Sequence, residues 1–195
     1  MTHRATTKRI VDVIGASLLL VMLSPLLLTG CLAVLVSMGR PILFLQRRSG
    51  KDAAPFQVFK LRTMTADSSD GKNDEMRVTR CGLLLRKFSI DEIPQLLNVL
   101  GGSMSLVGPR PLLPEYDDRY SARQVRRLEV KPGLTGLAQI TGRNELSWDE
   151  KLELDVRYVE TQSIWLDMAI MLKTPMVVLT ASGFRRVGEA RKFGE

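Results

Sequence analysis

Hydrophobic positions are concentrated in one long stretch near the start of this chain. Residues 13–39 contain no charged side chain. As a helix, these roughly 27 residues extend over about 40 Å, which exceeds the ~30 Å hydrocarbon core of a bilayer. The pattern therefore predicts a helix that enters a membrane.

The middle of this stretch and its two flanks favour a re-entrant helix over a straight span. Pro25 removes a backbone hydrogen bond from the helix, and the Ser24 side chain can bond to the freed carbonyl and stabilise a kink. Basic residues flank the stretch on both sides, and the positive-inside rule places both flanks in the cytoplasm. The flanking residues are His3, Arg4, Lys8 and Arg9 before the stretch, and Arg40, Arg47, Arg48 and Lys51 after it. The sequence thus predicts a helix-break-helix that dips into one leaflet and returns, with the break at Ser24-Pro25.

Two alternatives to this membrane arrangement remain. One is a straight transmembrane anchor, for which the stretch is long enough. The other is a lipoprotein signal that ends at Cys31, because a basic start and an apolar run precede Leu28-Thr29-Gly30-Cys31. Residues 32–36 stay apolar after that cysteine, whereas a secreted lipoprotein normally becomes polar there.

The rest of the chain has shorter patterns. Residues 42–46 and 56–61 are rich in β-formers and predict a hairpin. Helical segments are expected at 81–87 (helix or apolar tether), 94–100 (ending at Gly101-Gly102), 114–128, 148–160 and 163–180, the last as an interfacial or core helix. The fold class predicted is α+β and mainly helical, with a membrane helix over 1–40 and amphipathic interfacial helices around a cytoplasmic catalytic domain over 41–195.

Charge and composition limit the possible partners. The net charge of +7 calls for an anionic partner such as nucleic acid, acidic lipid or a phosphorylated small molecule. Only 6% of the residues are aromatic, which leaves few platforms for stacking bases and argues against nucleic acid. The stripe of Arg119, Arg123, Arg126 and Arg127 on segment 114–128 is either a solvated surface or a lipid- or phosphate-binding face. Two cysteines are too few for a disulfide framework and indicate a reducing compartment.

Asp91 and Glu92 are the main candidates for catalysis. Ser89-Ile90-Asp91-Glu92 fits a capping box, in which Glu92 would only bond back to the backbone of Ser89. Carboxylates in a first helical turn also face the positive end of the helix dipole and stay ionised. An ionised carboxylate can attack phosphorus, and its neighbour can hold a divalent metal. The pair is therefore either a structural cap or a nucleophile with a metal ligand.

A second candidate site is the turn Gly108-Pro109-Arg110-Pro111. It can be a rigid turn with a surface arginine, or a phosphate-binding fork that Pro109 and Pro111 hold in place. Lys60, Arg62, Arg86 and Arg143 could add positive charge to the same site. The chain contains no P-loop and no Gly-x-Gly-x-x-Gly signature. Its single histidine, His3, excludes histidine-based zinc or triad chemistry.

Seven motifs occur in an order that resembles one family, the bacterial sugar transferases known as monotopic phosphoglycosyl transferases. The motifs are the basic start at residues 8–12, Ser24-Pro25, Phe-Lys-Leu-Arg-Thr-Met at 59–64, Asp-Glu-Ile-Pro-Gln at 91–95, Ser-Leu-Val-Gly-Pro-Arg-Pro at 105–111, Lys-Pro-Gly-Leu-Thr-Gly at 131–136 and Leu-Glu-Leu-Asp at 152–155. The resemblance extends from about residue 7 to about residue 180, which corresponds to the minimal catalytic form. One departure is Ser103, where the family usually has aspartate before the methionine.

The resemblance implies a reaction and its participants. Such enzymes transfer a phospho-sugar from a UDP-sugar donor to a polyprenol phosphate such as undecaprenyl phosphate, with Mg²⁺, and release UMP. They work at the cytoplasmic face of the bacterial inner membrane through a covalent intermediate. By this resemblance Asp91 is the nucleophile, Glu92 helps to hold Mg²⁺, Arg110 binds phosphate and Lys60 orients the carboxylates or the diphosphate. The sugar, the polymer and the oligomeric state stay open, and an oligomer is compatible with the sequence. The rival from another class is a non-catalytic membrane adaptor that binds acidic lipid.

Overall fold

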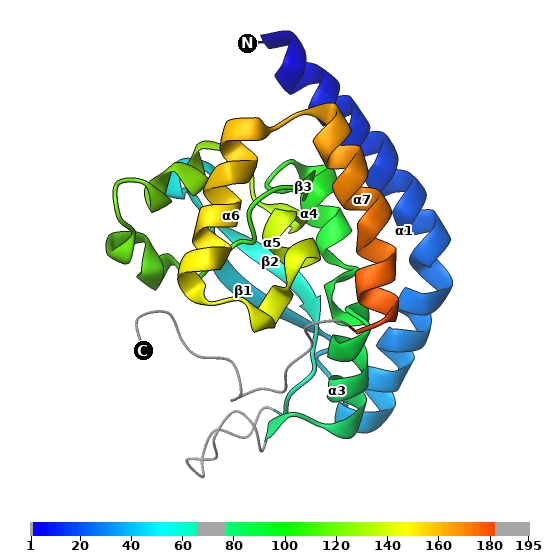
Figure 1. Cartoon of the computed structure of the whole chain (residues 1–195). Helices are drawn as coiled ribbons and strands as arrows, with labels where there is room; N and C mark the ends of the chain where they lie inside the picture. Colours follow the sequence, from blue (N-terminus) through cyan, green and yellow to red (C-terminus); the bar gives the residue numbers. More distant parts are fainter. Residues whose placement is uncertain (1, 66–76, 182–195) are drawn as a thin grey trace.

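One long helix, α1 (Thr2–Met38), runs along one side of the molecule, and the other elements pack against it (Figure 1). The computed structural model describes residues 2–65 and 77–181. Within them, β1 (Leu43–Ser49) and β2 (Pro55–Leu61) form an antiparallel hairpin, and β3 (Ser105–Val107) pairs in parallel with β4 (Gly133–Thr135). The remaining helices are α3 (Arg80–Lys87), α4 (Gln95–Gly101), α5 (Leu137–Thr141), α6 (Trp148–Thr161) and α7 (Ile164–Leu179). The prediction of a mainly helical chain with a small hairpin is confirmed.

The predicted break in the membrane helix is wrong, because α1 remains helical through Pro25. Pro25 has no N–H for the carbonyl of Val21, four residues earlier. The Ser24 hydroxyl donates to that carbonyl at 2.7 Å and replaces the missing bond. The ribbon of α1 bends about midway along its length (Figure 1). Ser24-Pro25 therefore accompanies a bend within one helix and does not separate two half-helices.

Both halves of α1 pack against the rest of the protein. Ala16 in the first half and Val34 in the second half are fully buried. A side chain larger than hydrogen at Gly30 would meet Leu61 of β2 at 2.9 Å, so the helix lies very close to the hairpin there. The opposite face of α1 is apolar and exposed, with Val21 at 75% and Val36 at 80% exposure. One side of the helix thus belongs to the core and the other has no protein partner in the described residues.

The helix predicted over 114–128 is also wrong. The chain forms two 3₁₀ segments instead, η3 (Pro114–Arg119) and η4 (Gln124–Glu129), and Tyr120 after η3 is extended. The arginine stripe does not form one free surface. Arg123 and Arg126 bind Glu160 of α6, whereas Arg127 is buried against Asp155 of the same helix. These ion pairs with α6 hold the segment in its irregular path.

The turn that carries Arg110 is fixed by the strand pair β3–β4. Gly108 N donates to Thr135 O, and Gly133 N donates to Pro109 O, both at 2.9 Å. A Cβ atom at Gly133 would lie 2.0 Å from Gly108 N, so no other residue fits at this crossing. The two glycine-containing motifs at 105–111 and 131–136 are therefore two sides of one packed contact.

Ser103 does not disturb the end of α4. Gly102 adopts φ +84° and closes the helix in the left-handed conformation that glycine favours. The Ser103 hydroxyl donates to Asn98 O at 3.2 Å. Helix α4 therefore ends at the same glycines although position 103 is serine and not the aspartate usual in the family.

Candidate active site

Asp91 and Glu92 lie in a short 3₁₀ turn, η2 (Ile90–Glu92), between α3 and α4. Ser89 before the turn has φ +54° and makes no side-chain capping bond. Its hydroxyl instead accepts a hydrogen bond from Arg143 Nη2 at 2.8 Å. The capping-box interpretation is therefore wrong, and the Glu92 carboxylate is directed elsewhere.

Glu92 binds two cations from distant parts of the chain. Its Oε1 accepts from Lys60 Nζ of β2 at 2.9 Å and from Arg110 Nη2 of the turn after β3 at 2.6 Å. Burial by itself would raise the pKa of Glu92, but these two cations outweigh it and hold the pKa well below its usual range. Glu92 is thus a permanently ionised link between the hairpin and the Arg110 turn.

Asp91 has the opposite environment. The residue is only 6% exposed, and its Oδ1 has no hydrogen-bond partner among the described residues. Burial is the main cause that raises its pKa to about 6, and the adjacent Glu92 charge adds to it, while Lys60, Arg86 and Arg110 oppose the rise. At neutral pH Asp91 is therefore mostly ionised, with one oxygen atom free. A carboxylate that is ionised and not tied up in protein hydrogen bonds can act as a nucleophile toward phosphorus.

The backbone of Arg110 is held by a buried ion pair. Arg127 Nη2 donates to Arg110 O at 2.5 Å and to Asp155 Oδ2 at 2.9 Å. Arg127 and Asp155 side chains are 2% and 4% exposed. Pro109 accepts a backbone bond from Gly133, and Pro111 is half-buried on the other side of Arg110. The Leu-Glu-Leu-Asp motif on α6 thus positions the arginine through Arg127.

The other predicted cations divide into two groups. Arg86 and Arg143 adjoin the carboxylates, since Arg86 affects the pKa of Asp91 and Arg143 responds to both Asp91 and Glu92. Arg86 Nε also donates to Thr63 Oγ1 at 2.8 Å. Arg62 is placed elsewhere, because its guanidinium binds the carbonyls of Met38, Gly39 and Arg40 at the end of α1. Arg62 therefore closes the end of α1, and its role as a phosphate ligand stays a prediction.

Sequence reasoning missed the site roles of Arg48, Arg127 and Asp155. Arg48 appeared only as part of a basic flank, yet Arg110 and Glu92 both affect its pKa. The signal that could have found it is the hairpin register, which places Arg48 on the same face as Lys60. Arg127 and Asp155 had no such local signal, because their contact joins segments 28 residues apart.

Asp91 fits a role in holding Mg²⁺. Its carboxylate has two hard oxygen atoms, so one can hold this cation, which prefers such donors, while the other attacks phosphorus. Glu92 fits less well, since its carboxylate already accepts from two cations. Within residues 2–65 and 77–181 no group of three metal-ligating side chains occurs. The protein alone therefore supplies one or two carboxylates, and phosphate oxygens of a substrate would supply further ligands, as is common for Mg²⁺.

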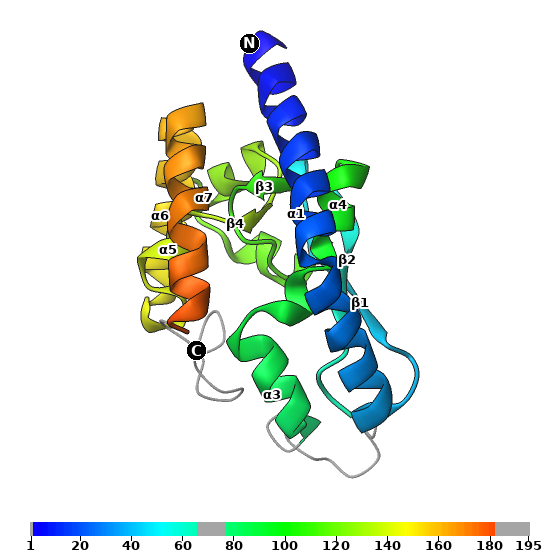
Figure 2. The same cartoon turned by 90° about the vertical axis from the view of Figure 1, so that its right-hand side faces the viewer.

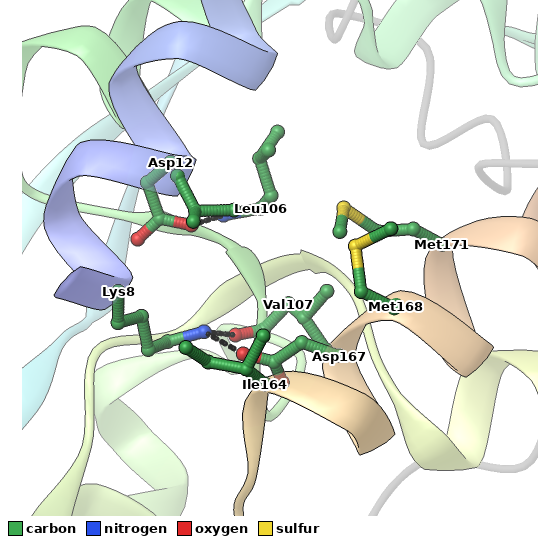
Figure 3. Close-up of a pocket in the computed structure, with 9 residues that line it drawn as sticks. Lys8, Asp12, Leu106, Val107, Ile164, Asp167, Met168 and Met171 are labelled. Carbon is green, nitrogen blue, oxygen red and sulfur yellow. Dashed lines mark hydrogen bonds and ion pairs between the residues drawn. The ribbon is translucent and has the colours of Figure 1, made fainter. Parts of the chain in front are cut away.

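A cavity elsewhere in the molecule is too small to be the substrate site. It has a volume of about 10 Å³ and lies between α1, β3 and α7 (Figure 3). Lys8 and Asp12 of α1 face Asp167, Met168 and Met171 of α7 across it (Figure 3). The space suits about one water molecule. The surface around Asp91 is the better candidate for chemistry, because unpaired charge is concentrated there.

A buried, unpaired carboxylate beside several cations defines a site suited to attack on a phosphate. Comparison with known proteins agrees with this class. Residues 3–181 match the family described as "Bacterial sugar transferase", so the chain belongs to that family. It is therefore an enzyme of the sugar-phosphate transferase kind, and the interpretation as a non-catalytic adaptor is wrong.

Individual relatives cover different shares of their own length. An uncharacterized sugar transferase, EpsL of Bacillus subtilis, is 49% identical over 92% of this chain and 90% of that protein. The UDP-glucose:undecaprenyl-phosphate glucose-1-phosphate transferase of Caulobacter vibrioides is 46% identical over 89% of this chain and 70% of that protein. The Escherichia coli protein of the same name is 40% identical over 86% of this chain, but only 39% of the relative is matched.

Proposed function

We propose that this protein transfers a phospho-sugar from a UDP-sugar to undecaprenyl phosphate and releases UMP. The observation that carries the proposal is Asp91, a buried carboxylate with a free oxygen atom beside Lys60, Arg86, Arg110 and Arg143. The names of the relatives from Caulobacter vibrioides and Escherichia coli supply the donor and acceptor classes. The product would begin a membrane-linked glycoconjugate or polysaccharide.

The first step forms a covalent intermediate. A carboxylate oxygen of Asp91 attacks the phosphorus that carries the sugar. The bond from this phosphorus to the bridging oxygen breaks, and UMP leaves with the electron pair. Arg110 stabilises the transferred phosphoryl group. Lys60 binds Glu92 and so helps to fix the carboxylate to which Arg110 is paired. Mg²⁺ bound at Asp91 and the diphosphate would neutralise the charge of the donor.

The second step returns Asp91 to its starting state. A phosphate oxygen of undecaprenyl phosphate attacks the same phosphorus, and the bond to the Asp91 oxygen breaks. The products are a polyprenyl diphosphate sugar and a free carboxylate. Because the sugar phosphate waits on the enzyme, the soluble donor and the lipid acceptor need not bind together.

The test of this reaction is a UMP-release assay across a panel of UDP-sugars, with intact-protein mass measurement in the absence of acceptor. The expected result is Mg²⁺-dependent UMP release and a mass increase of one phospho-sugar. Adding undecaprenyl phosphate should then remove the added mass. Turnover without any added mass in wild-type protein would contradict the covalent route.

We also propose that residues 1–40 enter the cytoplasmic leaflet of the inner membrane and return, and that residues 41–195 form the catalytic domain on that side. Both ends of α1 are bound to the same folded unit. Near the start, Lys8 binds Asp167 of α7, and at the end, Gly39 O accepts from Arg62 after β2. A helix that crossed the bilayer would separate these contacts.

Exposed apolar side chains agree with contact to lipid. The outer faces of α1 and α7 carry Leu18, Val21, Met22, Leu28, Trp165, Leu172, Met176 and Leu179, each at least 66% exposed. Both helices lie on the side turned toward the viewer in Figure 2. α1 is the only helix in the described part of the chain with the length and apolarity of a membrane span, over Ala5–Met38.

Cysteine labelling in intact cells tests this arrangement. Single cysteines at Ala5 and Ala53, with Cys31 and Cys81 replaced by serine, should both resist a membrane-impermeant reagent until the cells are opened. Both positions are exposed in the structure, so burial does not prevent labelling. Labelling of one site from outside would show an ordinary transmembrane anchor. Ser24→Ala with Pro25→Leu should favour a straight helix and increase such labelling.

A further inference from the structure

Arg48 is a half-buried cation with no role in the two reaction steps described above. It lies near the end of β1, paired with Phe56 of β2, whereas Lys60 is paired with Phe44 near the start of β1. Residues two and four positions along a strand share one face, so Arg48 and Gln46 lie on the face that carries Lys60. Arg48 Nη2 donates to Gln46 Oε1 at 2.6 Å. The guanidinium is therefore held back along the strand, in the direction of Lys60 and its partner Glu92.

The same end of the hairpin adjoins the Arg110 turn. Ser49 N donates to Leu112 O at 3.0 Å, and the Ser49 hydroxyl binds Asp117 at 2.5 Å. Leu112 is only two residues beyond Arg110. These contacts bring Arg48 and Arg110 to the same region from two separate elements.

Arg48 has no acidic partner there. Among the described residues its guanidinium binds only the neutral Gln46 side chain, and Glu92 is already shared by Lys60 and Arg110. Burial lowers the pKa of Arg48 to about 10, and repulsion from Arg110 is the next cause, while Glu92, Tyr116 and Tyr120 oppose the shift. A cation that is partly removed from water and repelled by its neighbour is stabilised when an anion binds beside it.

Arg143 also lacks an acidic partner among the described residues, and it lies near Asp91 because it binds Ser89. Within residues 2–65 and 77–181, its Nη1 is buried without a partner, and its Nη2 binds only Ser89. Arg143 binds Ser89, two residues before Asp91, whereas Arg48 precedes Ser49, which binds Leu112 on the other side of Arg110. The two arginines thus lie toward different ends of the site, with Arg110 available to both.

We infer that Arg48 binds the phosphate that leaves with uridine, while Arg143 lies beside the phosphate that stays on Asp91. This inference rests on the function proposed above. In displacement at phosphorus the leaving oxygen lies opposite the nucleophile. When its bond to the transferred phosphorus breaks, that oxygen keeps the electron pair, and the UMP phosphate gains negative charge. Arg48 is placed to stabilise this charge as it develops.

Separate measurement of the two half-reactions tests the assignment. The first is adduct formation with UMP release. The second is transfer from a preformed adduct, freed of UMP, to undecaprenyl phosphate. For Arg48→Gln we expect the first rate to fall by about 10- to 100-fold and the inhibition constant of UMP to rise similarly, as for loss of a charged hydrogen bond. The second rate should stay unchanged, and Arg48→Lys should restore part of the first.

Two further variants guard against a folding artefact. Gln46→Glu keeps Arg48 and supplies the missing carboxylate, so it should weaken UMP inhibition in the same direction by roughly 3- to 10-fold. Arg47→Gln removes the same charge from the exposed neighbouring position and should leave both half-reactions unchanged.

Three outcomes would overturn the inference. Equal loss in both half-reactions of Arg48→Gln, with normal Gln46→Glu, would assign Arg48 to folding. Unchanged UMP inhibition in both variants would show that Arg48 contacts no nucleotide phosphate, while the proposed reaction still stands. Failure of the wild-type protein to release UMP from any UDP-sugar would instead reject the proposed function, and this inference with it.

Discussion

Two clusters of buried charge in the described part of the chain differ in how completely their groups are paired. At the junction of α1 and α7, Lys8 Nζ binds Asp167 Oδ2 at 2.7 Å (Figure 3). The Tyr158 hydroxyl donates to Asp167 Oδ1, also at 2.7 Å. Both oxygen atoms of that carboxylate therefore have partners. Around Asp91, by contrast, one carboxylate oxygen has no partner. The first cluster is complete in itself, whereas the second needs another molecule to complete it.

This difference distinguishes structural charge from functional charge. A buried pair with full hydrogen bonding fixes the position of two elements, and removing one partner destabilises the fold. An incomplete cluster can instead bind a substrate and stabilise the charge that develops in its reaction, because its unpaired groups are already in position. The buried pair of Arg127 and Asp155 combines the two functions, since it is a structural ion pair that also holds the backbone of Arg110 beside the site.

The largest expected effect is that of Asp91→Asn. The amide cannot form an acyl phosphate, so turnover and the covalent mass increase should both disappear. The protein should unfold at a higher temperature at pH 7.5, because the change removes a buried charge whose Oδ1 lacks a partner. Near-normal turnover of this variant would show that Asp91 is not the nucleophile.

Lys8→Met should have the reverse pattern, with loss of stability. Asp167 would keep its charge but lose its cation, and the free energy of unfolding should fall by about 3 kcal/mol. Thermal unfolding in detergent measures this. Adding Asp167→Asn should recover part of the loss. The control is Arg126→Gln at the exposed pair with Glu160, where the loss of stability should be much smaller because solvent screens the pair. If Lys8→Met lowered the free energy of unfolding no more than Arg126→Gln does, the pair of Lys8 and Asp167 would not be a stabilising buried contact.

Arg110→Ala should weaken catalysis more than folding. The loss of a charge-assisted contact to phosphate should cost about 1.5–3 kcal/mol of transition-state stabilisation. This loss is measured as the decrease in kcat/KM for steady-state UMP release. Arg110→Lys should restore only part, because lysine lacks the planar fork. Unchanged kinetics would place Arg110 outside the phosphate site.

The smallest effect is that of pH. The pKa of Asp91 is raised to about 6, so the reactive carboxylate is present above that value and is lost as the pH falls through it. The rate of adduct formation should then fall about tenfold per pH unit below 6. Glu92 has a lowered pKa and stays ionised over this range. A rate that stayed constant down to pH 5 would contradict the burial of Asp91.

Local patterns in the sequence determined several elements correctly. Alternating β-formers predicted the hairpin, because side chains of a strand alternate between two faces. The glycines at 101–102 predicted the end of α4, since glycine adopts the left-handed conformation readily. The ordered motifs predicted the family. The pairing of Ser24 with the carbonyl freed by Pro25 was also predictable, because it depends on spacing within a single helix.

Tertiary structure alone decided which charges meet. Arg62 and Arg110 are both arginines in conspicuous motifs, yet Arg62 closes α1 and Arg110 binds Glu92. The two ionisable neighbours Asp91 and Glu92 acquire pKa shifts in opposite directions, because one lacks a partner and the other has two. The sequence by itself determined the types of charged residue and their local order. Which of them are paired depends on long-range packing and burial, since residues far apart in the chain supply the partners.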